Sequence, residues 1–368
     1  MSSNTDISPT EVAARLRDGD EDLYVLDVRN EDEYEEWNID GSHNVPVYDQ
    51  LSGGNTLGLE HSLDDVPEDA EVATVCVAGV VSQRAAQVLR NNGYDAKSMR
   101  GGMRGWAMVY QAYDVPDVDG VTQIVRPGTG CLSYVVQDGD EALVVDPGQH
   151  IQVYQNLAES RDLEIVAVAD THAHADHISG GRDLAAAEDV PYYLHEKDAR
   201  ELDRYTAVED GDEIAVGERD VDVLFTPGHT RGSISFRVGD AALTGDTLFV
   251  RSVGRPDLEG GSDVAREGAT LLFDSLDRLA DLPDGTVALP GHFSDEEMRP
   301  LAATIGELEA NNGLFGVDTK SEFVDTILED LPDTPANYNR IKRVNTGKEQ
   351  ATAEAETLEL GPNNCASN

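Results

Sequence analysis

A group of potential metal ligands lies between Thr171 and His177, where the sequence reads THAHADH. It directly follows an apolar run from Leu163 to Ala169, which predicts a buried strand leading into the group. At alternating spacing in an extended segment the first two histidines point to the same side, and the Asp-His pair follows on the turn. The candidate ligands are His172, His174, Asp176 and His177. Neutral imidazole and carboxylate are common metal ligands, so this loop predicts a metal site.

Three later stretches repeat this arrangement, because each is an apolar strand that runs through a glycine into one ligand-type residue. The strands Val221 to Thr226, Ala241 to Thr244 and Val287 to Leu289 lead to His229, Asp246 and His292, respectively. In layered α/β proteins the strand ends are where ligands collect, since loops converge there without disturbing the core. We therefore expect all of these side chains at one site.

The elements around these motifs predict a mostly antiparallel β-rich domain that begins near residue 121. We expect strands at 122–126, 132–137 and 142–145, and helices at about 151–160, 177–188 and 323–328. The segment 335–341 is expected to return to this domain. The stretch 114–120 is read as a linker, and 347–368 as a disordered acidic tail in which Cys365 has no chemical role.

The motifs, in this order, resemble those of the metallo-β-lactamase family over about residues 120 to 310. The resemblance implies a four-layered αβ/βα sandwich in which all of the family's ligand positions are filled. If every position binds, two metal ions, expected to be zinc, share Asp246, and a bridging hydroxide attacks an ester, thioester or phosphodiester. If only His172, His229 and Asp246 bind, they form a two-histidine, one-carboxylate face that suits non-haem Fe(II) and O₂. Spacing leaves both possibilities open.

Further residues resemble the persulfide dioxygenase branch of that family, namely 245–251, 254–257 and 335–338. The resemblance implies one Fe(II) per chain and the oxidation of a small thiol persulfide by O₂ to sulfite and thiol. His174, Asp176, His177 and His292 would then orient the ligands, while Arg255 and also Arg251 would hold carboxylates of the thiol carrier. The alternatives are a dinuclear zinc thioesterase resembling glyoxalase II and a sulfur carrier whose metal domain is only a scaffold.

The first 113 residues alternate predicted strands and helices, which indicates a doubly wound parallel sheet. The predicted strands are 23–28, 45–48 and 72–77, and the predicted helices begin at Pro9 and Ser82. Cys76 follows a buried strand and precedes a Gly-containing loop and a helix, a place that favours a thiolate or a bound anion. A buried structural cysteine is the alternative.

The motif order in this region resembles a rhodanese domain, a sulfurtransferase module that carries sulfur on its cysteine. The resemblance rests on 26–29, on the loop with Cys76, Gly79 and Ser82, and on 101–106. The family usually has Arg before the loop serine, where this chain has Val81, so a cation is missing and Arg84 is the nearest substitute. The resemblance implies a persulfide carrier at Cys76.

Charge is the unusual feature of the composition, with 72 acidic and 27 basic residues and a net charge of −45. Such a surface repels nucleic acid and anionic membrane, which argues against both as partners, and it is typical of a protein kept soluble in concentrated salt. The three cysteines cannot form a disulfide framework, and no apolar run is long enough for a membrane span. We expect a cytoplasmic protein, with a homodimer as the default assembly.

Overall fold

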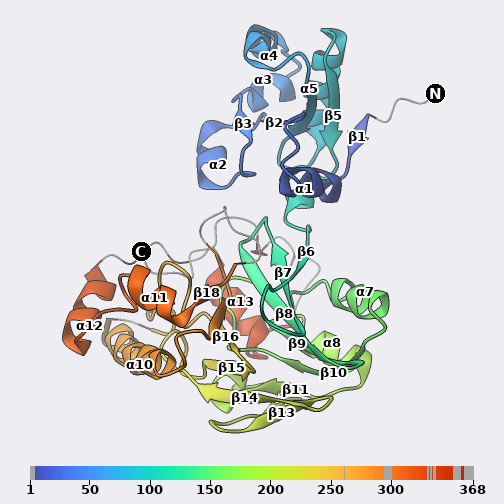
Figure 1. The fold of residues 1–368 in the computed structure, drawn as a ribbon. Helices are drawn as coiled ribbons and strands as arrows, with labels where there is room; N and C mark the ends of the chain where they lie inside the picture. The colour runs from blue at the N-terminus through green and yellow to red at the C-terminus, as the bar shows by residue number, and fades with distance from the viewer. Residues whose placement is uncertain are drawn as a thin grey trace. The chain divides into compact units, whose positions relative to one another are not determined.

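The computed structural model describes residues 5–260, 262–293, 301–329, 331, 334, 337–350 and 358–359. The chain divides into two compact units, the first made largely of residues 1–111 and the second largely of residues 112–359. In the described residues no helix is long and apolar enough to cross a membrane. Each unit is considered by itself (Figure 1).

The first unit is built on a five-stranded parallel sheet. In spatial order its strands are β1 (Asp6–Ile7), β5 (Asp95–Met99), β4 (Glu71–Val75), β2 (Leu23–Asp27) and β3 (His43–Asn44). The helices are α1 (Pro9–Arg17), α2 (Glu31–Glu36), α3 (Tyr48–Ser52), α4 (Leu57–His61), α5 (Val80–Asn91) and α6 (Gly102–Trp106), with a 3₁₀ turn at Leu63–Asp65. One core cluster packs α3, α4 and α5 against the sheet, and a second cluster packs α1 and α6. The doubly wound parallel sheet is confirmed.

Local sequence signals explain where some of these elements begin. Ser8 Oγ accepts a hydrogen bond from the Glu11 amide at 3.1 Å, so Ser8 caps α1 with Pro9 in the first turn. The predicted strand at 45–48 is wrong, because β3 ends at Asn44 and Tyr48 already begins α3. Pro46 explains the difference, since it has no N–H to give to a strand ladder.

The second unit contains two mixed sheets with a shared core between them. The seven-stranded sheet has the order β12 (Thr206–Ala207), β11 (Tyr192–Leu194), β10 (Glu164–Ala169), β9 (Glu141–Val145), β8 (Cys131–Asp138), β7 (Val121–Arg126) and β6 (Gln111–Asp114). The six-stranded sheet has the order β13 (Glu213–Val216), β14 (Arg219–Phe225), β15 (Ile234–Val238), β16 (Ala241–Gly245), β17 (Val287–Pro290) and β18 (Ala303–Thr304). Apolar side chains of both sheets interdigitate, as in a β-sandwich core.

Helices cover the outer face of each sheet, which completes the predicted αβ/βα order of layers (Figure 1). The helices of this unit are α7 (Gln152–Ser160), α8 (Gly181–Glu188), α9 (Glu196–Ala199), α10 (Ser262–Ala280), α11 (Ile305–Asn311), α12 (Lys320–Glu329) and α13 (Tyr338–Asn345). Apolar residues of α10, α11 and α12 form a second core cluster against the six-stranded sheet. The four-layered fold class is confirmed.

Two segment boundaries differ from the prediction. The second unit's sheet already includes β6, so residues 115–120 are the turn between β6 and β7, closed by a 2.9 Å bond from the Val115 amide to the Val121 carbonyl. In the segment expected to be a disordered tail, Leu358 and Glu359 are buried, and Leu358 packs on Ile178. Cys365 and the motif residues Pro335 and Ala336 lie outside the described residues.

Candidate metal centre

The His-rich loop leaves the end of β10 and is buried along its whole length. Asp146 fixes its start, because one carboxylate oxygen accepts hydrogen bonds from the Thr171 amide at 2.6 Å and the Thr171 hydroxyl at 3.1 Å. Asn345 of α13 fixes its end, because its side-chain amide donates to the carbonyls of His174 and His177 at 2.9 and 2.8 Å. Rigid backbone anchors of this kind hold metal ligands in a set geometry.

The helix predicted at 177–188 begins only at Gly181. The four residues before it are held in other ways, since the Ile178 amide donates to Glu359 and the Ser179 amide donates to Asn345. Residues 177–180 therefore belong to the loop, which keeps the His177 ring inside the site rather than on a helix surface. Composition favoured a helix here, but tertiary contacts decided the boundary.

Three ligand-type side chains from three different strand ends converge in the core of the site. His172 follows β10, His229 follows β14, and Asp246 follows β16. Asp246 Oδ2 lies 3.7 Å from His172 Nε2 and 3.5 Å from His229 Nε2. Ligands at about 2.1 Å from one metal ion lie about 3.0 to 3.4 Å apart, so a small contraction of this trio would complete a site.

The other polar atom of each of these three side chains already has a partner. His172 Nδ1 lies 2.9 Å from the Thr171 hydroxyl, His229 Nδ1 donates to the Arg255 carbonyl at 2.9 Å, and Asp246 Oδ1 accepts from His292 Nδ1 at 2.6 Å. The facing atoms, His172 Nε2, His229 Nε2 and Asp246 Oδ2, are buried and have no hydrogen-bond partner in the described part of the chain. Unpaired buried polar atoms are costly, so three that face one another fit a bound cation.

The protonation states of this trio suit metal binding. Burial lowers the pKa of His172 well below its usual value, helped by the charge of His174, and burial likewise lowers the pKa of His229. For Asp246, burial opposes ionisation, but the positive charge of His292 outweighs it and the pKa lies below its usual range. Two neutral imidazoles and one carboxylate therefore face the same point, which is the form in which these groups bind metals.

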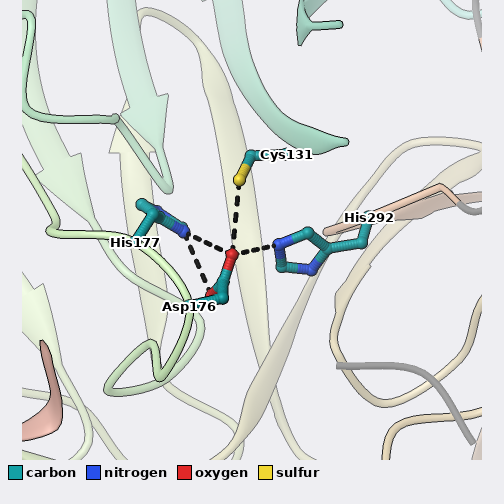
Figure 2. A group of neighbouring side chains, drawn as sticks. All are labelled: Cys131, Asp176, His177 and His292. Atoms are coloured by element: carbon teal, nitrogen blue, oxygen red, sulfur yellow. Dashed lines mark hydrogen bonds and ion pairs between the residues drawn. The ribbon is translucent and has the colours of Figure 1, made fainter. Parts of the chain in front are cut away.

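A second group lies beside the trio and is drawn in Figure 2. Asp176 Oδ2 accepts hydrogen bonds from the Cys131 thiol at 3.3 Å, from His177 Nδ1 at 3.2 Å and from His292 Nε2 at 2.7 Å. One ligand atom from each of the four residues lies within 4.8 Å of the others. The group has the composition of a closed zinc site, with one thiolate-type, one carboxylate and two imidazole ligands.

The charges of the second group shift the pKa values of both His292 and Cys131. Burial opposes a charged imidazole, but Asp246 and Asp176 on its two sides raise the pKa of His292 well above its usual value. Burial and Asp176 would raise the pKa of the Cys131 thiol, but the imidazoles His177 and His292 outweigh them and the pKa is lowered. The second group therefore has the charges of an internal ion-pair network.

The second histidine of the sequence motif, His174, is turned away from the trio. His174 Nε2 lies 3.1 Å from Asp146 Oδ1 and 3.9 Å from Asp170 Oδ1. Burial would lower the pKa of His174, but these carboxylates raise it. The predicted set thus divides into His172, His229 and Asp246 on one side, Asp176, His177 and His292 on another, and His174 on a third.

Several residues of the site were not predicted from the sequence. These are Cys131, Asp146, Asp170, Asp198 and Asn345. Asp198 accepts from the Ala173 amide and from the Thr230 hydroxyl at 2.8 and 2.6 Å, so it ties two ligand loops together. Asp146 and Asp170 each follow a strand, so the strand-end pattern that found Asp246 could also have found them. No sequence signal indicates Asn345.

Arg255 has a different environment from the predicted substrate-binding one. Its side chain is 1% exposed and its guanidinium forms a two-point ion pair with Asp257 at 2.7 and 2.9 Å. Its backbone carbonyl instead orients His229. Arg251 is exposed, and its role in substrate binding stays a prediction.

Cys76 lies at the predicted place, in the loop between β4 and α5. Its side chain is buried, and its sulfur accepts from the Ser82 amide at 3.3 Å and lies 3.4 Å from the Ser82 hydroxyl. The expected cation is not supplied by Arg84, because its guanidinium donates to the backbone carbonyls of Leu51 and Ser52. The loop therefore keeps the Cys76 and Ser82 positions that resemble the rhodanese loop, but it lacks both an arginine at position 81 and a replacement from Arg84.

Comparison with known proteins agrees with this architecture. Residues 126–292 match the metallo-beta-lactamase superfamily, and residues 8–108 match the rhodanese-like domain. An uncharacterized protein of Mycobacterium tuberculosis is 36% identical over 201 residues, which cover 44% of this chain and 85% of that protein. The probable metallo-hydrolase YqgX of Bacillus subtilis is 33% identical over 187 residues, covering 45% of this chain and 86% of YqgX.

Among solved structures, that of ETHE1 from Myxococcus xanthus is similar, with a TM-score of 0.54 and 27% identity. The match covers 66% of this chain and 99% of ETHE1. The fold and the buried ligand sets together define a metal-binding αβ/βα domain. The chain belongs to the metallo-beta-lactamase superfamily and carries a rhodanese-like domain at its start.

Proposed function

We propose that the protein is a persulfide dioxygenase that oxidises a low-molecular-weight thiol persulfide with O₂ to sulfite and thiol, using one Fe(II) held by His172, His229 and Asp246. The observation that carries the proposal is the set of three unpaired, buried atoms that face one another, while Asp176, His177 and His292 are hydrogen-bonded in the neighbouring group. When bound, Fe(II) would supply a centre for O₂ and sulfur chemistry, since three protein ligands leave open positions.

The residues around the trio have definable tasks in this reading. The Arg255 carbonyl fixes the His229 ring so that Nε2 faces the metal position, and the Thr171 hydroxyl does the same for His172. His292 holds Asp246 Oδ1 and thereby limits this carboxylate to one free oxygen. Buried walls exclude bulk water from the trio, because all three ligands are at most 2% exposed. These contacts preset the geometry before any substrate binds.

Two comparisons support sulfur chemistry. The rhodanese-like domain resembles a module that handles sulfane sulfur, a sensible neighbour for an enzyme that consumes persulfide. The similarity to ETHE1 of Myxococcus xanthus extends over nearly the whole of that protein, and it adds to the resemblance of residues 245–251 and 254–257 to the persulfide dioxygenase branch. Fold similarity alone does not fix a reaction, so the chemistry of the trio and the metal identity decide the assignment.

The deciding experiment measures O₂ uptake by anaerobically purified protein after addition of glutathione persulfide or coenzyme A persulfide, at several salt concentrations. Iron and zinc are quantified on the same sample. We expect O₂ uptake with sulfite release and about one iron per chain. Two zinc ions per chain, no O₂ uptake and rapid cleavage of a thioester such as S-lactoylglutathione would refute the proposal.

The second candidate is a dinuclear zinc hydrolase, most simply a thioesterase of the glyoxalase II type. The favouring observation is the second group of Cys131, Asp176, His177 and His292, whose ligand atoms are close enough to hold another ion. The relative YqgX, described as a probable metallo-hydrolase, is consistent with this alternative. The same measurement of metal content and thioester cleavage separates the two candidates.

A further inference from the structure

Two cavities of the second unit concentrate basic side chains. A cavity of about 280 Å³ is lined by the cations Arg200, Lys342, Arg343 and Lys348, with Glu259 as its acidic residue. A larger cavity of about 770 Å³ shares Arg200 and Glu259 with the first, and its further charged residues are Lys197, Arg231 and Glu267. The shared residues make the two cavities neighbours, so six cations line one continuous region of the surface.

This concentration runs against the composition of the chain. Acidic residues outnumber basic ones 72 to 27, and only five residues are lysines. Three of these lysines, Lys197, Lys342 and Lys348, line the two cavities. An even distribution of charge would make such a region acidic, so the local excess of cations indicates a site for an anion.

The positive charge of Lys342 carries a desolvation cost. Its side chain is partly buried, burial lowers its pKa, and Nζ donates to the Leu258 carbonyl at 2.8 Å. A carbonyl does not neutralise an ammonium group, and partial burial removes some of its hydration. The other cations are partly offset by acidic neighbours, since Arg200 pairs with Glu259, Arg231 with Glu259 and Glu267, Arg343 with Glu349, and Lys348 lies 3.9 Å from Glu201. Among the described residues, the ammonium group of Lys342 has only a carbonyl as its hydrogen-bond acceptor. An anionic ligand would offset the cost at Lys342.

The cavity walls are the same segments that carry the metal trio and its supports. Pro227 and Arg231 line the larger cavity and flank His229 in the sequence. Lys342 and Thr346 line the smaller cavity from α13 and its end, beside Asn345, which holds the His-rich loop. A molecule in these cavities would therefore lie against residues that are close in sequence to His229 and Asn345.

We infer that these two cavities bind the multiply charged anionic arm of the thiol whose persulfide is oxidised, with the sulfur directed to the trio. This inference rests on the proposed function. Cations spread over both cavities fit several separated anionic groups, as in a thiol that carries phosphates at a distance from its sulfur, better than one carboxylate. Arg200 and Arg231, which pair with Glu259 in the structure, can bind phosphate or carboxylate oxygens of a ligand in a two-point manner when they exchange that partner. Arg255, enclosed by its own ion pair with Asp257, has no part in this site.

The test compares coenzyme A, glutathione and the uncharged thiol 2-mercaptoethanol, first as thiols in calorimetric binding to the iron-loaded protein and then as persulfides in turnover. The variants are Lys342→Gln, Arg200→Gln and the exposed Lys348→Gln, which keeps the test open if a more buried change impairs folding. The control is Lys320→Gln on α12, whose side chain pairs with Asp274 away from both cavities. Circular dichroism and metal content establish that each variant is folded.

We expect wild-type protein to bind coenzyme A more tightly than glutathione, and both more tightly than 2-mercaptoethanol. Each cavity variant should weaken coenzyme A binding about tenfold and raise KM for its persulfide by a similar factor, more than for the uncharged persulfide. Added salt should weaken the binding of the charged thiols more than that of 2-mercaptoethanol. The control variant should bind all three thiols as wild type does. If the cavity variants weaken glutathione binding more than coenzyme A binding, the anionic groups of the arm are carboxylates rather than phosphates.

The inference is overturned if wild-type protein binds the three thiols with equal affinity. It is also overturned if the cavity variants raise KM for the uncharged and the charged persulfides by the same factor. Because thiol binding is measured without turnover, the two proposals fail separately. Coenzyme A binding that depends on Lys342, together with no persulfide oxidation, would refute the dioxygenase and keep the anion site. Oxidation of all three persulfides with equal KM values would keep the dioxygenase and refute the anion site.

Discussion

His292 Nδ1 lies 2.6 Å from Asp246 Oδ1, while the other oxygen of the same carboxylate faces the two unpaired histidine nitrogens. The contact has two effects. It opposes the influence of burial on both groups, so the pKa of Asp246 is lowered and that of His292 is raised. It also turns the carboxylate so that only Oδ2 is available to the trio. His292 is therefore a positioning residue for Asp246, which a variant can test.

Removing one member of the trio should remove the metal. We expect His172→Ala to reduce bound iron from about one per chain to a small fraction and to reduce O₂ uptake by at least about a hundredfold, because two remaining ligands hold the ion poorly. Metal analysis and oxygen electrode measurements check this. His61→Ala, at an exposed histidine of α4, is the control. Full activity of His172→Ala would contradict the assignment of the trio.

The variant His292→Asn distinguishes a mononuclear site from a dinuclear one. An asparagine amide can still donate to Asp246 Oδ1 but carries no charge, so in a mononuclear site iron stays near one per chain while its affinity falls about tenfold to a hundredfold. In a dinuclear site the same change removes a ligand, and metal content falls from two ions to one. Metal analysis after equilibration with a competing chelator gives the answer.

Cys131 provides a test of the second group. Zinc titrated into iron-loaded protein should occupy Cys131, Asp176, His177 and His292, because a thiolate with two imidazoles favours zinc. Cys131→Ser should weaken this zinc binding about tenfold or more without removing the iron. Cys365→Ser is the matched control for loss of a thiol elsewhere in the sequence. Equal zinc affinity in Cys131→Ser and wild type would exclude the thiol as a ligand.

Asn345→Asp tests the anchor from α13. The substitution keeps the shape of the side chain but removes the two N–H donors that hold the carbonyls of His174 and His177. We expect iron affinity to fall about tenfold and the melting temperature to drop by several degrees, since buried carbonyls lose their partners. Asn339→Asp on the exposed side of the same helix is the comparison. An unchanged iron affinity would show that the loop holds its form without the anchor.

Glu71 of the first unit gives a pH-dependent prediction remote from the metal. It pairs with Lys97 at 2.6 Å and with Arg15, and although burial opposes ionisation these cations lower its pKa. A carboxylate with a lowered pKa in the folded state stabilises the fold above its unfolded pKa of 4.5 and loses that contribution as pH falls below it. Glu71→Gln should therefore cost about 1 kcal/mol at pH 7 and progressively less below pH 4.5 in urea unfolding. A pH-independent cost would contradict this account.

The ligand loops could be predicted from the sequence because each pairs a local apolar strand pattern with a polar strand end. His172, His229 and Asp246 follow this rule, and the fold brings them together as expected. The division of the ligand set could not be predicted. Whether His174 faces the trio or Asp146 depends on where β9 ends relative to β10, and this is a property of sheet register rather than of either segment alone.

Other features of the site could not be predicted for similar reasons. Neither the complete burial of Arg255 nor its ion pair with Asp257 is visible in local spacing. The basic cavities were missed because their cations come from α9, α13 and the loops beside them, which are distant in the sequence. Apolar periodicity predicts which face of an element is buried. It does not predict which side chains of distant elements become neighbours.

The last contacts of the His-rich loop come from residues that the ribosome adds much later. Asn345 and Glu359 follow Ile178 by more than 160 positions, and both bond to this loop. Domains generally fold as units during synthesis, so a nascent chain that ends before these residues has its histidines but not their fixed arrangement. We therefore expect metal to bind only after this domain has been synthesised as far as these residues.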